Sequence, residues 1–207
     1  MIKALLLIFE PATAWDRVVR AQRSVGFILV CFLLPLLTLG CAAEGFSLMR
    51  WGRVRAYMTQ PTTFSLGEII VYEAGLALLM FVGLFAGAEF IKLLGETFHG
   101  RHTYRQAFTT AAYGLSPLLA LRLLDAFPNP NLWVSWGIWT VGIMLSVGVL
   151  YQGVPRVMQP DPPHAFGLYL MSSILLVLIA WLIRFLATGY LQGQFKSLEQ
   201  FVSRLVG

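Results

Sequence analysis

The chain has 207 residues, of which 57% are hydrophobic and only 12% are charged, and its formal net charge is +5. A soluble domain carries about 25% charged residues, and exposing the apolar surplus to water would cost roughly 25 cal/mol per Å². The composition therefore excludes an ordinary soluble domain and predicts an integral membrane protein. We expect no nucleic-acid partner.

The first 23 residues are a lead-in that precedes the apolar part of the chain. The stretch "MIKALLLIF" is followed by Glu10 and Pro11, with no small-residue cleavage site, so a cleaved signal peptide is not predicted. Pro11 suits the first turn of a helix, and Arg17, Arg20 and Arg23 recur at helical spacing. We expect an amphipathic segment on the membrane surface, where each basic residue gains about 1 kcal/mol from anionic headgroups.

Five apolar runs are long enough to cross about 30 Å of hydrocarbon, which takes about 20 residues. They cover residues 24–43, 69–91, 107–127, 132–151 and 166–190. The runs are apolar all round, whereas the strands of a membrane β-barrel alternate apolar and polar residues. The predicted fold is all-α: a polytopic bundle of five membrane-spanning helices with short interfacial amphipathic helices, forming a single domain over residues 1–207.

The segment 46–58 is predicted as one of the interfacial helices, because its apolar and basic residues fall on different helical faces. Five crossings place the two termini on opposite sides of the membrane. Cytoplasmic loops collect Lys and Arg, and the side that holds the N-terminus has eight such residues against five on the other. We therefore expect a cytoplasmic N-terminus and a C-terminus on the opposite side.

Catalytic and metal motifs are weak. Glu96, His99 and His102 form E-x-x-H-x-x-H, with ligand types that suit zinc or iron. Gly100 weakens a helix between the histidines, so a solvated loop is the preferred interpretation and the metal site an alternative. Ser116 lies in "GLSP", which lacks a nucleophile elbow, and the chain has no phosphate-binding or dinucleotide-binding loop. We predict neither enzyme activity nor a cofactor.

Polar residues inside the spans are the other candidates, because charges are expensive there. Glu73, Glu89, Arg122 and Arg184 fall within the predicted spans. We interpret them as interface anchors or interhelical pairs rather than as a proton or substrate relay. The exception is Glu73, which with Ser116 is the candidate intramembrane polar site.

Glycine and proline residues predict packing and kinks. Gly83 and Gly87 are four residues apart, a spacing that lets two helices approach closely, within the bundle or in a homodimer. Pro117 cannot donate a hydrogen bond to the carbonyl of Tyr113, so that carbonyl needs another partner, such as Ser116. Pro35 has the same effect in the first span.

The order of these features resembles the bacterial branch of the YIP family, relatives of the Ypt/Rab-interacting membrane proteins. The resemblance rests on "FHGRHTYRQAF" leading into "AAYGLSPLL", and on "LYQGVP" after the fourth span. The matching signature positions are Gly100, Thr103, Tyr104, Tyr113, Pro117, Gly153 and Pro155. The resemblance implies a five-helix bundle with a cytoplasmic N-terminus, in the bacterial inner membrane, and none of the matching residues is catalytic. Only about 24 residues precede the first span, unlike the long cytosolic region of the eukaryotic relatives, so a GTPase partner is not expected.

Two functions remain open. The first is a non-enzymatic scaffold or adaptor that binds membrane lipids and other membrane proteins, or associates with itself, and organises or shapes the membrane. The second is a small permease or channel component, which would need a hydrated cavity near the midplane lined by Glu73, Tyr113 and Ser116.

Overall fold

The structure is a computed structural model, and it describes residues 2–54, 60–97, 103–128 and 131–194. Of these residues 86% are helical, and none forms a strand. Five helices are long and apolar enough to cross a membrane. The predicted all-α transmembrane bundle is thus confirmed.

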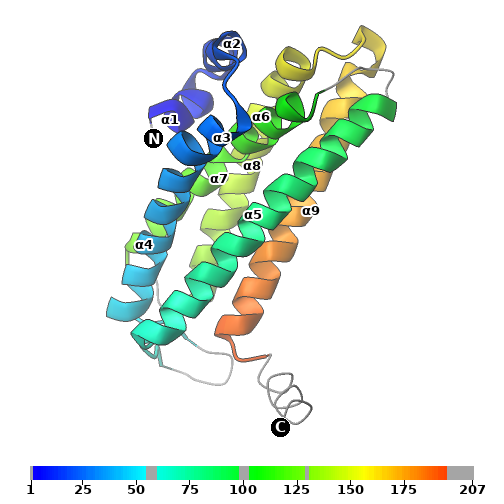
Figure 1. The fold of residues 1–207 in the computed structure, drawn as a ribbon. Coiled ribbons are helices and arrows are strands. Elements are labelled where there is room, and N and C mark those ends of the chain that lie inside the picture. The colour runs from blue at the N-terminus through cyan, green and yellow to red at the C-terminus, as the bar shows by residue number, and fades with distance from the viewer. Residues whose placement is uncertain (1, 55–59, 98–102, 129–130, 195–207) are drawn as a thin grey trace.

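Two short helices precede the first span. They are α1 (Ile2–Phe9) and α2 (Pro11–Ala21), and Pro11 occupies the first turn of α2 as predicted. Helix α2 lies at one end of the bundle (Figure 1). The side chain of Trp15 is fully buried, so α2 is packed against the bundle.

The first span is longer than predicted and is interrupted by a π-helical turn. It comprises α3 (Val25–Ile28), η1 (Leu29–Leu33) and α4 (Leu34–Arg50). The π turn ends two residues before Pro35, and the Leu34 N–H donates to the Leu29 carbonyl, five residues earlier, as in a π-helix.

The expected interfacial helix over 46–58 is not formed. Its first residues continue α4 to Arg50, and Arg53 instead pairs with Thr62 through two backbone hydrogen bonds. Apolar Leu48 is buried against the bundle, which explains why the helix continues along the bundle rather than turning along the surface; residues 55–59 lie outside the described part.

The third span is a broken helix. It comprises α6 (Tyr104–Gly114), α7 (Ser116–Leu121) and the 3₁₀ turn η2 (Arg122–Ala126). The break falls at Leu115, and the Ser116 hydroxyl donates to the Tyr113 carbonyl at 2.6 Å. The carbonyl left free by Pro117 therefore has the partner that the sequence suggested.

The remaining spans are continuous helices. They are α5 (Leu66–Thr97), α8 (Leu132–Met158) and α9 (Ala165–Leu191), the last preceded by the 3₁₀ turn η3 (Pro162–His164). In Figure 1, α5 and α9 run side by side along the bundle. A side chain at Gly83 would meet Ile179 and Ile183 of α9, and one at Gly87 would meet Leu176. The structure thus places both glycines at a helix contact within the bundle.

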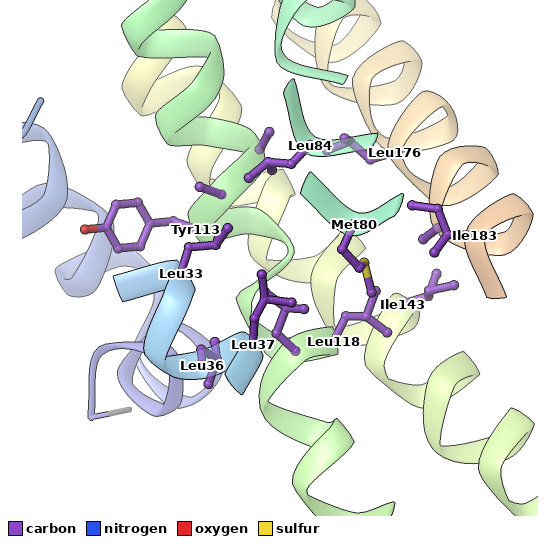
Figure 2. Close-up of a cluster of buried hydrophobic side chains, with 14 of the residues drawn as sticks. Leu33, Leu36, Leu37, Met80, Leu84, Tyr113, Leu118, Ile143, Leu176 and Ile183 are labelled. Atoms are coloured by element: carbon purple, nitrogen blue, oxygen red, sulfur yellow. The ribbon is translucent and has the colours of Figure 1, made fainter. Parts of the chain in front are cut away.

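The centre of the bundle is apolar. Side chains from η1, α4, α5, α7, α8 and α9 converge there, as Figure 2 shows for Leu37, Met80, Leu118, Ile143 and Ile183. Large apolar side chains also cover the outside, as expected for a surface solvated by lipid. The lead-in helices and the end of α9 at Leu191 lie at opposite ends of the bundle (Figure 1).

Candidate functional site

A group of charged side chains is buried at the bundle end opposite the lead-in helices, and we call it the charge cluster. Its members are Glu44 from α4, Tyr72 and Glu73 from α5, Arg122 and Asp125 from η2, Ser135 from α8, Arg184 from α9, and Arg53 from the segment after α4. Each is at most 7% exposed. The sequence distributes them over 141 positions, and only the packing of the bundle brings them together.

Glu44 is the centre of the charge cluster. Its Oε1 accepts hydrogen bonds from Arg53 Nη1 at 3.1 Å and from Arg184 Nη1 at 3.2 Å. The same oxygen accepts from the Tyr72 hydroxyl at 3.0 Å. Its Oε2 accepts from Arg122 Nη2 at 2.9 Å. One carboxylate therefore connects four separate segments of the chain.

Two extensions continue from this centre. Arg122 Nη2 also donates to Glu73 Oε2 at 3.0 Å. On the other side, Arg184 Nη2 contacts the Ser135 hydroxyl, which donates to Asp125 Oδ1 at 2.8 Å. The guanidinium of Arg184 also lies 5.1 Å from the centre of the Trp139 ring, a distance typical of a cation–π contact.

The charge cluster lies inside the membrane-spanning part of the helices. Glu73 follows the start of α5 by seven residues, and Arg184 precedes the end of α9 by seven. At 1.5 Å per residue, both lie roughly 10 Å within the helix ends. The surrounding protein shields these side chains from solvent, so each charge depends on protein partners.

The formal charges of the cluster balance. Three arginines accompany Glu44, Glu73 and Asp125, so the group has no net charge in the described part of the chain. Such a group can hold helices together, because removing one partner of a buried ion pair typically costs 3–5 kcal/mol. It offers no excess negative charge for a divalent cation.

The structure separates the two members of the predicted polar site. Glu73 belongs to the charge cluster, whereas the Ser116 hydroxyl is used by the Tyr113 carbonyl. Of the other intramembrane charges, Arg122 and Arg184 form interhelical pairs, while Glu89 lies on the surface and pairs with Lys92 at 3.2 Å.

Sequence reasoning did not single out the centre of the charge cluster. Glu44 lies one residue beyond the predicted end of the first span, and Arg53 was placed in an interfacial helix. The signal was the lack of any proline between Glu44 and Arg50, which allows α4 to continue and carry the carboxylate inside.

The metal motif is only partly visible. His99 and His102 lie outside the described residues, and Glu96 at the end of α5 is 3.9 Å from Lys92 Nζ. Among the described residues, no three His, Cys, Asp or Glu side chains are grouped so that they could hold a metal ion.

Two signature residues, Thr103 and Tyr104, stand at the start of the third span, at the lead-in end. Thr103 caps α6 through a reciprocal pair of hydrogen bonds with Gln106, and Tyr104 follows it, 6.1 Å from the Phe108 ring. Gly100 lies outside the described residues, and Pro117 and Pro155 are within spans three and four.

Gly153 leaves the space in which the Trp15 side chain of α2 packs. A side chain at this position would overlap the Trp15 indole, and Trp15 Nε1 donates to the Val149 carbonyl at 2.9 Å. The ring of Tyr113 lies at an edge contact with Trp15, with centres 6.2 Å apart. Two signature residues thus position α2 on the bundle.

Comparison with known proteins gives one match. The family model described as the Yip1 domain matches residues 5–184, which include both α2 and nearly all of the five spans. No curated protein and no solved structure matches the chain.

Proposed function

The chain belongs to the Yip1 domain family, and from this premise we propose that it is a non-enzymatic scaffold or adaptor. It would bind membrane lipids or other membrane proteins, itself included, as a single domain. Proteins of this family are not known as enzymes. The observation that carries the proposal is the charge cluster, because its hydrogen bonds and ion pairs join α4, α5, η2, α8 and α9 and hold the helices in one arrangement.

The centre of the bundle also supports a role that does not involve transport. The described residues leave an apolar space of about 20 Å³ there, lined by Met80, Leu118 and Ile183 among others. This is close to the minimum volume for a single water molecule, and the walls offer it no polar partner. A permease would direct Glu73, Tyr113 and Ser116 into one chamber, but Glu73 pairs with Arg122, the Ser116 hydroxyl donates to the Tyr113 carbonyl, and the Tyr113 hydroxyl bonds to neither of the other two side chains.

The lead-in end is the better surface for recognition. Arg17 and Arg20 are exposed on α2, and α2 is held in place by Trp15 and by an ion pair of 3.3 Å between Asp16 and Arg156 of α8. A rigid basic surface next to the membrane suits a negatively charged partner surface or anionic lipids.

We place this end in the cytoplasm and the chain in a bacterial inner membrane. The supporting observation is the excess of Lys and Arg on the lead-in side. A reporter enzyme that functions only outside the cytoplasm should be active when fused after residue 207. Activity of a cytoplasm-specific reporter at the same position would reverse the orientation.

The adaptor proposal is tested by site-specific photo-crosslinking in intact cells. A photoreactive residue replacing Arg20 on α2 should give a discrete adduct that mass spectrometry identifies as one membrane protein or lipid. The same residue replacing Leu78, which is 63% exposed on the lipid-facing side of α5, is the matched control and should give only bulk lipid.

The opposite outcome is equally measurable. The purified chain, reconstituted into liposomes, should leave proton and potassium fluxes at the level of empty liposomes. A flux that wild-type protein supports and that Glu73→Gln abolishes would replace the adaptor proposal with a transporter.

A further inference from the structure

A cavity opens at the lead-in end, between α2, α3, α6 and the C-terminal end of α8. Its volume is about 280 Å³, and it is partly enclosed. The cavity lies where α3 and α6 begin and α8 ends, so in a bilayer it is at the level of the lipid headgroups.

The cavity is basic. Arg23 and Arg105 line it, and no Asp or Glu is among the described residues of its wall. Neither arginine has a carboxylate within ion-pair distance in the described part of the chain. Arg23 instead lies 4.6 Å from the centre of the Phe27 ring, which leaves its N–H groups free to donate.

The wall also presents neutral hydrogen-bonding groups. The Tyr113 ring is only 2% exposed, yet its hydroxyl points away from the apolar centre (Figure 2) and makes no hydrogen bond to any described residue. A tyrosine hydroxyl at the end of a buried ring usually has a partner. Here the cavity offers the space for a partner from outside the chain.

Two glutamines complete the wall. Gln22 ends α2 with φ 41° and Gln159 ends α8 with φ 46°, and within the described ranges they are the two residues other than glycine with positive φ. Such a backbone is uncommon for residues with a side chain. Both residues line the cavity, and neither side-chain amide makes a hydrogen bond to another described residue.

We propose that this cavity binds a phosphate group. Two guanidinium groups supply the charge and a geometry that matches phosphate oxygens, and the Tyr113 hydroxyl and the glutamine amides supply further donors. The phosphate is presented by a lipid headgroup or comes free from solution. This inference deepens the proposed function, because it gives the adaptor a ligand class, and it rests on the membrane placement made there.

The test is native mass spectrometry of the purified full chain, delipidated in mild detergent. Three ligands are added separately: phosphatidylglycerol, diacylglycerol, which lacks the phosphate, and inorganic phosphate. We expect one phosphatidylglycerol to be retained in clear preference to diacylglycerol. Retention of inorganic phosphate alone would assign the site to a soluble phosphate instead.

Variants locate the binding in the cavity. Replacing Arg23 and Arg105 together by Gln should weaken phosphate binding at least about tenfold, because charge-assisted hydrogen bonds are lost. Arg17→Gln removes one positive charge from α2, outside the cavity wall, and should leave the affinity within about twofold, as expected for a distant screened charge. Tyr113→Phe keeps the buried ring and should weaken binding several-fold.

Each contrary result is decisive. Equal losses in Arg17→Gln and in the double variant would mean general attraction to a basic surface, and no retention of either phosphate by the wild type would remove the site. Thermal unfolding of each variant in the same detergent shows whether it is folded. If phosphate binding fails while crosslinking at position 20 still identifies a partner, the cavity assignment falls and the adaptor proposal stands.

Discussion

The two ends of the bundle differ in whether their polar side chains are paired within the chain. At the end of the charge cluster, Glu44 receives hydrogen bonds from three arginines and from Tyr72. At the lead-in end, Arg23, Arg105 and the Tyr113 hydroxyl face a cavity and have no such partners among the described residues. In the first arrangement each charged side chain has at least one partner within the chain, although Glu73 Oε1 and the Nε atoms of the arginines make no hydrogen bond. In the second, the three groups have no hydrogen-bond partner among the described residues.

The difference shows which end carries stability and which is available for recognition. A buried charge without a partner is expensive, so the charge cluster can hold the helices together because each of its charged side chains has at least one partner. At headgroup level water and lipid phosphates can satisfy donors, so unpaired arginines cost little there. Tyr72 and Tyr113 make the contrast testable, since both rings are buried but their hydroxyl groups lie at opposite ends.

The largest expected effect is at the centre of the charge cluster. Glu44→Gln keeps the shape of the side chain but leaves three arginines without their shared carboxylate. We expect the free energy of unfolding to fall by about 3–5 kcal/mol, the usual cost of breaking a buried ion pair. Titration of the protein in mild detergent with a denaturing detergent measures this change.

The matched control for Glu44 is Glu89→Gln. Glu89 pairs with Lys92 on the surface, and its side chain is 49% exposed, so the loss should stay below about 1 kcal/mol. Equal losses in the two variants would contradict a stabilising role for the charge cluster.

A second prediction removes one hydroxyl from the charge cluster. Tyr72→Phe deletes the donor that lies 3.0 Å from Glu44 Oε1. A hydrogen bond to a charged group contributes about 1.5–3 kcal/mol, and we expect a loss in that range by the same titration. A neutral result would show that the arginines alone satisfy Glu44.

Hydropathy predicted the five membrane crossings well. Each crossing must be a helix with about 20 apolar residues, because the hydrocarbon layer has a fixed thickness and offers no partner for polar backbone groups. The errors lie at the helix ends. The predicted first span ends at residue 43, one residue before Glu44, yet α4 continues to Arg50, with the Glu44 carboxylate paired to Arg122 and Arg184. A neutralising partner from another helix is not visible in a hydropathy window.

The charge cluster could be predicted only in part for the same reason. Glu73, Arg122 and Arg184 are conspicuous as charges within apolar runs. Nothing in their spacing says that the two arginines meet at Glu44 or that Glu73 joins them through Arg122. Local chemistry was easier to foresee. Ser116 is adjacent to Pro117, and the partner of the Tyr113 carbonyl follows from the geometry of one helical turn.

The third prediction concerns the attachment of α2. Trp15→Phe removes the indole N–H that donates to the Val149 carbonyl and leaves part of the space beside Gly153 empty. We expect α2 to be destabilised by about 1–2 kcal/mol. Hydrogen exchange should rise in residues 11–21 and stay unchanged in α5 and α9, because the lead-in helix can detach locally. Exchange that rises equally throughout would mean that the two ends unfold as one unit.

The smallest effect on stability should come from the hydroxyl at the lead-in end. Tyr113→Phe deletes the same atom as Tyr72→Phe, from a ring that is buried to the same degree, at 2% against 3% exposure. The Tyr113 hydroxyl has no hydrogen bond to a described residue, so the delipidated protein should change by less than about 0.5 kcal/mol, as expected where no hydrogen bond is lost. Added phosphatidylglycerol should then stabilise wild type more than the variant, because a ligand that binds only the folded state raises the free energy of unfolding. If Tyr113→Phe lowers stability as much as Tyr72→Phe without any ligand, its hydroxyl is already engaged within the chain, and the cavity has one donor fewer to offer.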